Sequence, residues 1–68
     1  MKDERKQQLI NFCIEVAKYE CDNTLSENDK IEKINLGMSK IRPSFMETIM
    51  MDELVSDFIE KIERGEEI

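Results

Sequence analysis

Few side chains of this sequence are suited to catalysis, because it contains no histidine. Its absence removes the commonest general base and the commonest zinc ligand. Carboxylates are numerous, but no pair is singled out, and an acid–base pair needs a cleft that separates two pKa values. The glycines Gly37 and Gly65 stand apart, so no phosphate-binding loop is present. We therefore predict no catalytic residue and no cofactor, and we expect that the protein is not an enzyme.

The segment that starts at Asp22 carries oxygen-bearing side chains at the spacing of a calcium loop. Asp22, Thr24 and Ser26 fall at positions 1, 3 and 5 of that template. The sixth position, which requires glycine, is Glu27, and the twelfth, which requires glutamate, is Lys33. These two mismatches exclude the template, and we predict no metal site.

The two cysteines are eight residues apart, at Cys13 and Cys21. In a helix they would be separated by roughly 12 Å along the axis, whereas a disulfide needs Cα atoms within about 7 Å. We expect free thiols that are buried or half-buried. An intermolecular bridge and a reactive thiol are the alternatives.

The stretch Leu36-Gly37-Met38-Ser39 resembles the prosthetic-group site of acyl carrier proteins, which are also small, acidic and helical. In that family the modified serine follows an aspartate and precedes leucine or isoleucine. Here Met38 precedes Ser39 and Lys40 follows it, so the resemblance covers about four residues. It implies an acyl-carrier-like module that uses Ser39; the other interpretation is an exposed polar residue on a helix.

Length and composition predict one small helical domain over residues 1–68, with 40% hydrophobic and 38% charged residues. A chain this short hides only about 60% of its unfolded surface, and such domains often need staples or partner chains. No apolar run approaches the roughly 18 residues of a membrane span, and the start of the sequence lacks the apolar stretch of a secretion signal. We expect a cytoplasmic protein that does not contact a membrane. Frequent Ile, Lys, Glu and Asn are typical of an AT-rich bacterial or phage genome.

Apolar residues recur at helical spacing along the whole chain, and strand-like alternation is absent. We expect helices over about 3–21, 26–41 and 44–64. Apolar residues of the first cover about 220° of a helical wheel, which predicts a helix that is central in its own domain or buried by a second chain. The second carries a narrow apolar stripe of Ile31, Ile34, Met38 and Ile41, and Pro43 must end this helix by Arg42.

The apolar phase of the third segment changes near Met51. One side of its helical wheel carries Phe45, Met46, Ile49 and Met50. The other side carries Met51, Leu54, Val55, Phe58, Ile59 and Ile62. A straight helix cannot turn both sets toward one core. Either the helix breaks near residue 51, or its first half packs on its own chain and its second half on a partner.

Negative charge is concentrated in the last third of the chain. Residues 1–21 and 22–42 each carry four basic and four acidic groups, whereas residues 43–68 carry two basic and eight acidic groups. Glu53, Asp57 and Glu60 share one face, opposite the Met51–Ile62 stripe. This face is either a solvated surface or a match for a basic partner. Direct binding to nucleic acid is not expected, because phosphate contacts need a basic patch.

Together these patterns predict an all-α, three- or four-helix bundle that packs as a homodimer. The expected function is a small protein-binding module, a bacterial or phage regulator or inhibitor that acts through helix-mediated contact. Its partner or dimer interface is assigned to Met51, Leu54, Val55, Phe58, Ile59 and Ile62. The alternative is a structural subunit of a homo-oligomeric assembly with no separate target.

Overall fold

Three α-helices joined by two short connections make up the computed structural model, which describes residues 2–68: α1 Asp3–Glu20, α2 Glu27–Ile41 and α3 Phe45–Glu63. The all-helical prediction is therefore confirmed. The third segment is one helix, continuous through Met51, and it does not break near residue 51. No helix within residues 2–68 has the length and apolarity needed to cross a membrane.

Local capping explains where the helices begin. The Ser44 hydroxyl accepts a hydrogen bond from the Glu47 amide (3.2 Å), and the Glu47 carboxylate accepts one from the Ser44 amide (2.9 Å). This is the capping box that the sequence predicts for α3. Ser26 caps α2 by accepting from the Asp29 amide at 3.1 Å. Asp3 has a side chain suited to an N-cap, but Lys2 holds the cap position of α1 and forms no side-chain bond there.

The second helix continues through Gly37 to Ile41, and Arg42 ends it in the left-handed conformation with a φ of 49°. Pro43 follows directly, so the chain turns there and enters α3 two residues later. At the far end of α3, Gly65 has a φ of 80° and closes the helix, as expected for a glycine after the last turn.

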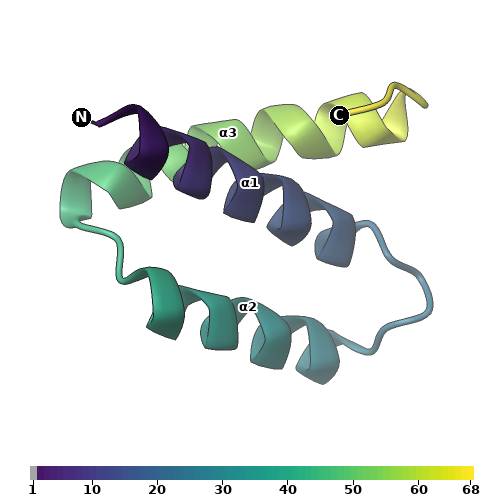
Figure 1. The fold of residues 1–68 in the computed structure, drawn as a ribbon. Coiled ribbons are helices and arrows are strands. Elements are labelled where there is room, and N and C mark those ends of the chain that lie inside the picture. Colours follow the sequence, from purple (N-terminus) through teal and green to yellow (C-terminus); the bar gives the residue numbers. More distant parts are fainter. Residues whose placement is uncertain (1) are drawn as a thin grey trace.

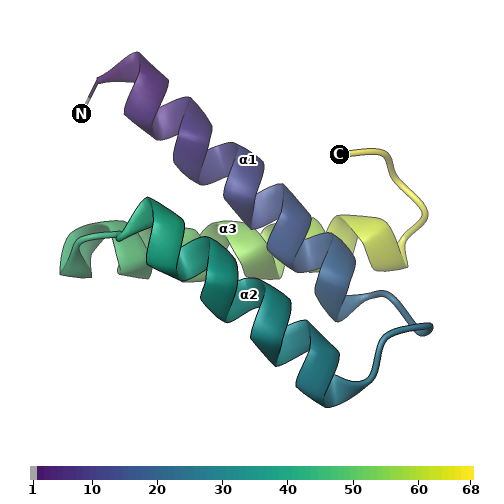
Figure 2. The ribbon, with the colours of Figure 1, turned by 60° about the horizontal axis from the view of Figure 1, so that its bottom comes forward.

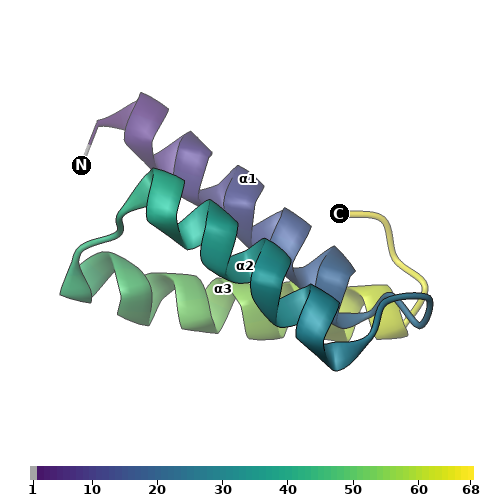
Figure 3. The ribbon, with the colours of Figure 1, turned by 90° about the horizontal axis from the view of Figure 1, so that it is seen from below.

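The first helix is the centre of the molecule. Figure 1 shows α2 on one side of α1 and α3 on the other; Cα atoms of both come within 8 Å of Cα atoms of α1, whereas those of α2 and α3 do not come that close to each other. Figures 2 and 3 show α1 and α2 running antiparallel, while α3 crosses both obliquely. The core consists of Leu9, Phe12 and Cys13 from α1 with Met51 from α3. The wide apolar arc of α1 is thus explained by its central position within one chain.

Polar contacts fix both ends of this arrangement. At one end the Arg5 guanidinium binds the Glu47 carboxylate through two hydrogen bonds of 2.9 and 3.0 Å, and it reaches the Arg42 carbonyl at 3.4 Å. At the other end the Lys30 ammonium donates to the Glu20 carbonyl at 3.1 Å. Each contact therefore ties the start or end of α1 to a neighbouring element.

Candidate functional site

The two most exposed large apolar side chains within residues 2–68, Phe45 and Met46, lie at the start of α3, next to the less exposed Ile49. Phe45 is 79% exposed, Met46 72% and Ile49 45%. They occupy the side of α3 that points away from α1, because the core residue Met51 lies on the other side of the same helix. We call these three residues the outer patch.

The six residues assigned by sequence to a partner interface face α1 of the same chain. Met51 is buried, and Leu54, Val55 and Phe58 pack against the core. Ile59 and Ile62 are half-buried and line a hollow next to Cys21 at the end of α1. The structure thus brings this stripe together as an internal face. Its role toward a partner stays a prediction.

The predicted acidic face is exposed along the second half of α3. Glu53, Asp57 and Glu60 are all exposed. Glu60 forms an ion pair with Arg64 at 3.6 Å, whereas Glu53 and Asp57 form none with any residue in the range 2–68. Asp57 and Lys61 have the i, i+4 spacing of a helical ion pair but do not form one; the Lys61 ammonium lies over the Phe58 ring, 5.9 Å from its centroid.

An apolar groove opens between α2 and α3, where the two helices are not packed directly against each other. It encloses about 340 Å³. Phe12 and Val16 of α1 form its floor. The walls are Ile34 and Met38 of α2, with Met51 and Val55 of α3, and the rim is Thr48, Asp52 and Ser56. We call it the α2–α3 groove. Its only charged lining residue is Asp52.

The three lysines of α2 do not line this groove. Lys33 and Lys40 line a different hollow on the opposite side of α2, where the Lys33 ammonium lies 5.8 Å from the centroid of the Tyr19 ring. Lys30 is buried against the end of α1. The groove and the adjoining face of α3 are therefore acidic and apolar in character.

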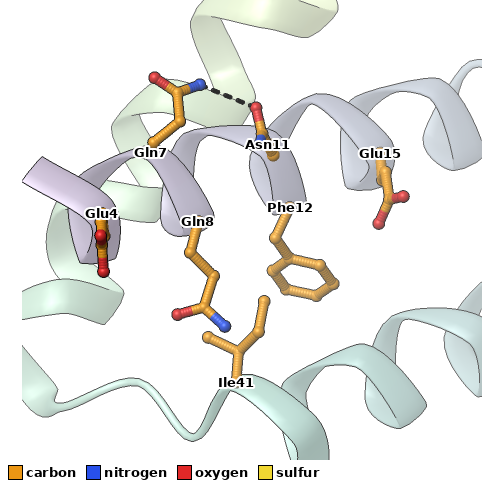
Figure 4. A pocket seen from close by; sticks show the side chains of 7 residues that line it. All are labelled: Glu4, Gln7, Gln8, Asn11, Phe12, Glu15 and Ile41. Carbon is orange, nitrogen blue, oxygen red and sulfur yellow. Dashed lines mark hydrogen bonds between the residues drawn. The ribbon is translucent and has the colours of Figure 1, made fainter.

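A second hollow, of about 520 Å³, lies between α1 and the end of α2 (Figure 4). Gln8 points toward Ile41 within it, while Gln7 and Asn11 bind each other at 2.9 Å. Its two carboxylates, Glu4 and Glu15, are 15 − 4 = 11 residues apart on one helix, or about 16 Å along the axis. That separation exceeds the roughly 5–9.5 Å between the paired catalytic carboxyl groups of glycoside hydrolases.

The thiols of Cys13 and Cys21 and the carboxylate of Asp22 lie in the core and at the end of α1. Cys13 is buried, its thiol lies 3.8 Å from the Met51 carbonyl, and burial raises its pKa, with a smaller contribution from Asp52. Cys21 is half-buried, and both cysteines are free, as predicted. Asp22 accepts hydrogen bonds from the amide and hydroxyl of Thr24, which lower its pKa. No cluster of residues within 2–68 could hold a metal ion.

Ser39, the residue carried by the acyl-carrier resemblance, is exposed near the end of α2. Its hydroxyl donates to the Asn35 carbonyl at 3.0 Å, one turn earlier on the same helix. This bond is the ordinary local contact of a serine in a helix.

Sequence reasoning placed Phe45, Met46 and Ile49 on one side of α3 but could not say that this side faces solvent. It did not find the α2–α3 groove. The predicted apolar stripe of α2 contains Ile34 and Met38, which form one wall of the groove. The floor and the other wall come from α1 and α3, and the sequence does not show that they lie beside this stripe. No family model matches the chain, and neither a curated protein nor a solved structure matches it significantly.

Proposed function

We propose that this chain is a small cytoplasmic protein-binding module, a bacterial or phage regulator or inhibitor that acts through helix-mediated contact. The observation that carries the proposal is the outer patch: Phe45 at 79% and Met46 at 72% exposure, next to Ile49 on the same helix face. Single exposed apolar residues are common. Contiguous large ones, rimmed by polar residues, are typical of interaction sites.

The mechanism would be occlusion of a target surface. Burying apolar area gains roughly 25 cal/mol per Å², and aromatic residues and methionine are enriched in interfaces. The acidic residues Glu53, Asp57 and Glu60 lie farther along α3, where they would attract targets with basic rims and raise the rate of association.

Self-association is the second candidate, either as a homodimer or as a subunit of a larger assembly. The outer face of α3 is apolar at Phe45–Ile49 and acidic from Glu53 to Glu60. An antiparallel pairing of two α3 helices would bring the outer patches together and keep the acidic stretches apart. A parallel pairing would place acid against acid and is disfavoured.

Affinity capture with paired variants tests the proposal. The double variant Phe45→Asp/Ile49→Asp removes the outer patch. Leu36→Asp is the matched control, because Leu36 is also an exposed apolar residue (59%) but lies on α2. We expect the wild type and the control to retain one stoichiometric protein from an extract of the encoding organism, and the double variant to lose it.

Sedimentation of the purified protein separates the two candidates. A species of twice the 8.1 kDa chain mass that reverts to monomer in the double variant favours self-association. A monomer that retains no host protein, or retention that is equal in all three proteins, contradicts the proposed function.

A further inference from the structure

The three helices share the pattern of neighbours of a four-helix bundle that lacks one helix, although α3 crosses α1 and α2 obliquely. In such a bundle each helix contacts two neighbours, and helices on a diagonal do not meet. Here α1 contacts both α2 and α3, while α2 and α3 are not packed directly against each other, and they lie on different sides of α1 (Figure 1). The vacant position is diagonal to α1, between α2 and α3, where the α2–α3 groove opens.

We propose that this groove binds one amphipathic helix of a partner protein, with apolar residues on the face that enters the groove and Lys or Arg beside it. The inference rests on the proposed function and specifies the partner class. The walls provide Ile34 and Met38 on one side and Met51 and Val55 on the other, above the ring of Phe12. A helix that presents apolar residues at i, i+3 or i+4 and i+7 fits such a groove.

The length of the groove sets the size of the ligand. Its α3 wall runs from Thr48 to Ser56, which spans about 12 Å at 1.5 Å per residue. Two to three turns of the partner helix would therefore lie in the groove. Methionine, present on both walls as Met38 and Met51, adapts to side chains of different shape.

Charge selects a basic helix over an acidic one. Asp52 lies on the rim and is the one charged residue that lines the groove. The basic side chains of α2, Lys33 and Lys40, lie on its other side. Lys or Arg beside the apolar stripe of a partner would thus meet the Asp52 carboxylate, which favours fast and selective association.

A second copy of this chain fits the groove less well. Each copy has a net charge of −6, and the exposed side of α3 is acidic beyond the outer patch. Inserting that helix into an acidic groove would bring like charges together, which costs binding energy.

Nuclear magnetic resonance with defined peptides tests the inference. The probe is an 18-residue synthetic helix with leucine along one face and lysine on the other. A second peptide has glutamate in place of lysine, and a third has the leucines and lysines scrambled so that no apolar face forms. We expect the first peptide to shift the amide signals of Ile34, Met38, Asp52, Val55 and Ser56, and the other two to bind at least about tenfold more weakly.

Two variants with the same change of charge locate the site. Ser56→Arg adds a cation at the exposed rim of the groove, and Leu36→Arg adds one on α2, where Leu36 lies beside Lys33 and Lys40. We expect Ser56→Arg to weaken binding of the leucine–lysine peptide at least about tenfold and Leu36→Arg to change it by less than about threefold. Both residues are exposed, and circular dichroism checks that both variants fold.

Three results would overturn the inference. The first is that signal changes are confined to the exposed carboxylates and the scrambled peptide binds as well as the leucine–lysine peptide. The second is that the two arginine variants weaken peptide binding equally, and the third is that a second copy of the chain fills the groove in a dimer without peptide. If host-protein capture still depends on the outer patch while the groove variants have no effect, only this inference fails. If that capture fails but the peptide binds in the groove, only the patch-based function fails.

Discussion

Substituting alanine for Gly37 should destabilise the protein, although glycine is normally a weak residue within a helix. In an exposed helix this change gains about 1 kcal/mol. Here a Cβ atom at Gly37 would overlap Cε1 of Phe12 and would lie 2.9 Å from Cζ and 3.2 Å from Cδ1. Favourable carbon–carbon contacts are about 3.5–4.0 Å long. Because the Phe12 ring is in the core and only 4% exposed, it must shift within packed surroundings.

The size of the effect follows from two opposing contributions. Overpacking a core costs typically 1–3 kcal/mol, and the gain in helix propensity offsets about 1 kcal/mol of it. We expect a net loss of about 1 kcal/mol in the free energy of unfolding. For a domain of this size that corresponds to a fall of roughly 4–8 °C in Tm.

Thermal and urea unfolding followed by circular dichroism measure the effect in a double-mutant cycle. Phe12→Leu removes the ring atoms that the new Cβ would meet. In that background we expect Gly37→Ala to be neutral or stabilising, so that the coupling free energy is about 1 kcal/mol or more. Ser39→Ala is the control on the same helix, since Ser39 is exposed and bonds only the Asn35 carbonyl.

The close approach of α1 to α2 is what this cycle examines. A rise in Tm for Gly37→Ala similar to that of Ser39→Ala would show that the Phe12 ring does not lie against Gly37. Equal effects of Gly37→Ala in both backgrounds would refute the same contact.

Three further predictions concern the contacts that fix the helices. The Arg5 guanidinium lowers the pKa of Glu47 from 4.5 to about 2. The ion pair therefore stabilises the fold above pH 4.5, and this contribution is lost as the pH falls toward 2. The urea midpoints of Glu47→Gln and wild type should differ at pH 7 and converge near pH 2. Cys21 should react with a thiol reagent under native conditions. Cys13 is buried and has a raised pKa, so it should react only as fast as the fold opens to expose it. Equal reaction rates of the two thiols would contradict the burial of Cys13. Lys30→Met keeps the side-chain stem but loses the bond to the α1 carboxyl end, and calorimetry should show a loss of about 1–2 kcal/mol; an unchanged Tm would refute this role.

Local signals predicted the helix boundaries well because their causes lie within a few residues. Pro43 removes a backbone donor and restricts the residue before it, and the pair Ser44 and Glu47 forms a reciprocal cap. Where two local solutions compete, sequence alone does not choose. Thr24 and Ser26 both could cap α2, and Ser26 does so, while Thr24 bonds Asp22 within the connection.

The orientation of α3 could not be predicted, because both sides of this helix are apolar in its first half. The contact that accompanies the observed choice joins Arg5 and Glu47, which are 42 residues apart in sequence. Because Glu47 is held against α1, Met51, which lies one turn later in α3, faces the core, and Phe45 points outward. A helical wheel contains no information on such a distant pair, so it could not show that the exposed apolar residues of α3 lie in its first half.

The α2–α3 groove could not be predicted from the sequence for a related reason, because it lies between two helices that are not packed directly against each other. Its walls are held apart because α1 fills its own side, with Leu9, Cys13 and Ala17 fully buried. A ligand that binds only the folded form stabilises it by about 2.7 kcal/mol at a hundred times its dissociation constant, which is a large fraction of the ~3–5 kcal/mol that a single core of this size supplies. A partner helix that binds the groove as proposed would therefore raise the stability of the bundle, so that groove occupancy and unfolding are coupled.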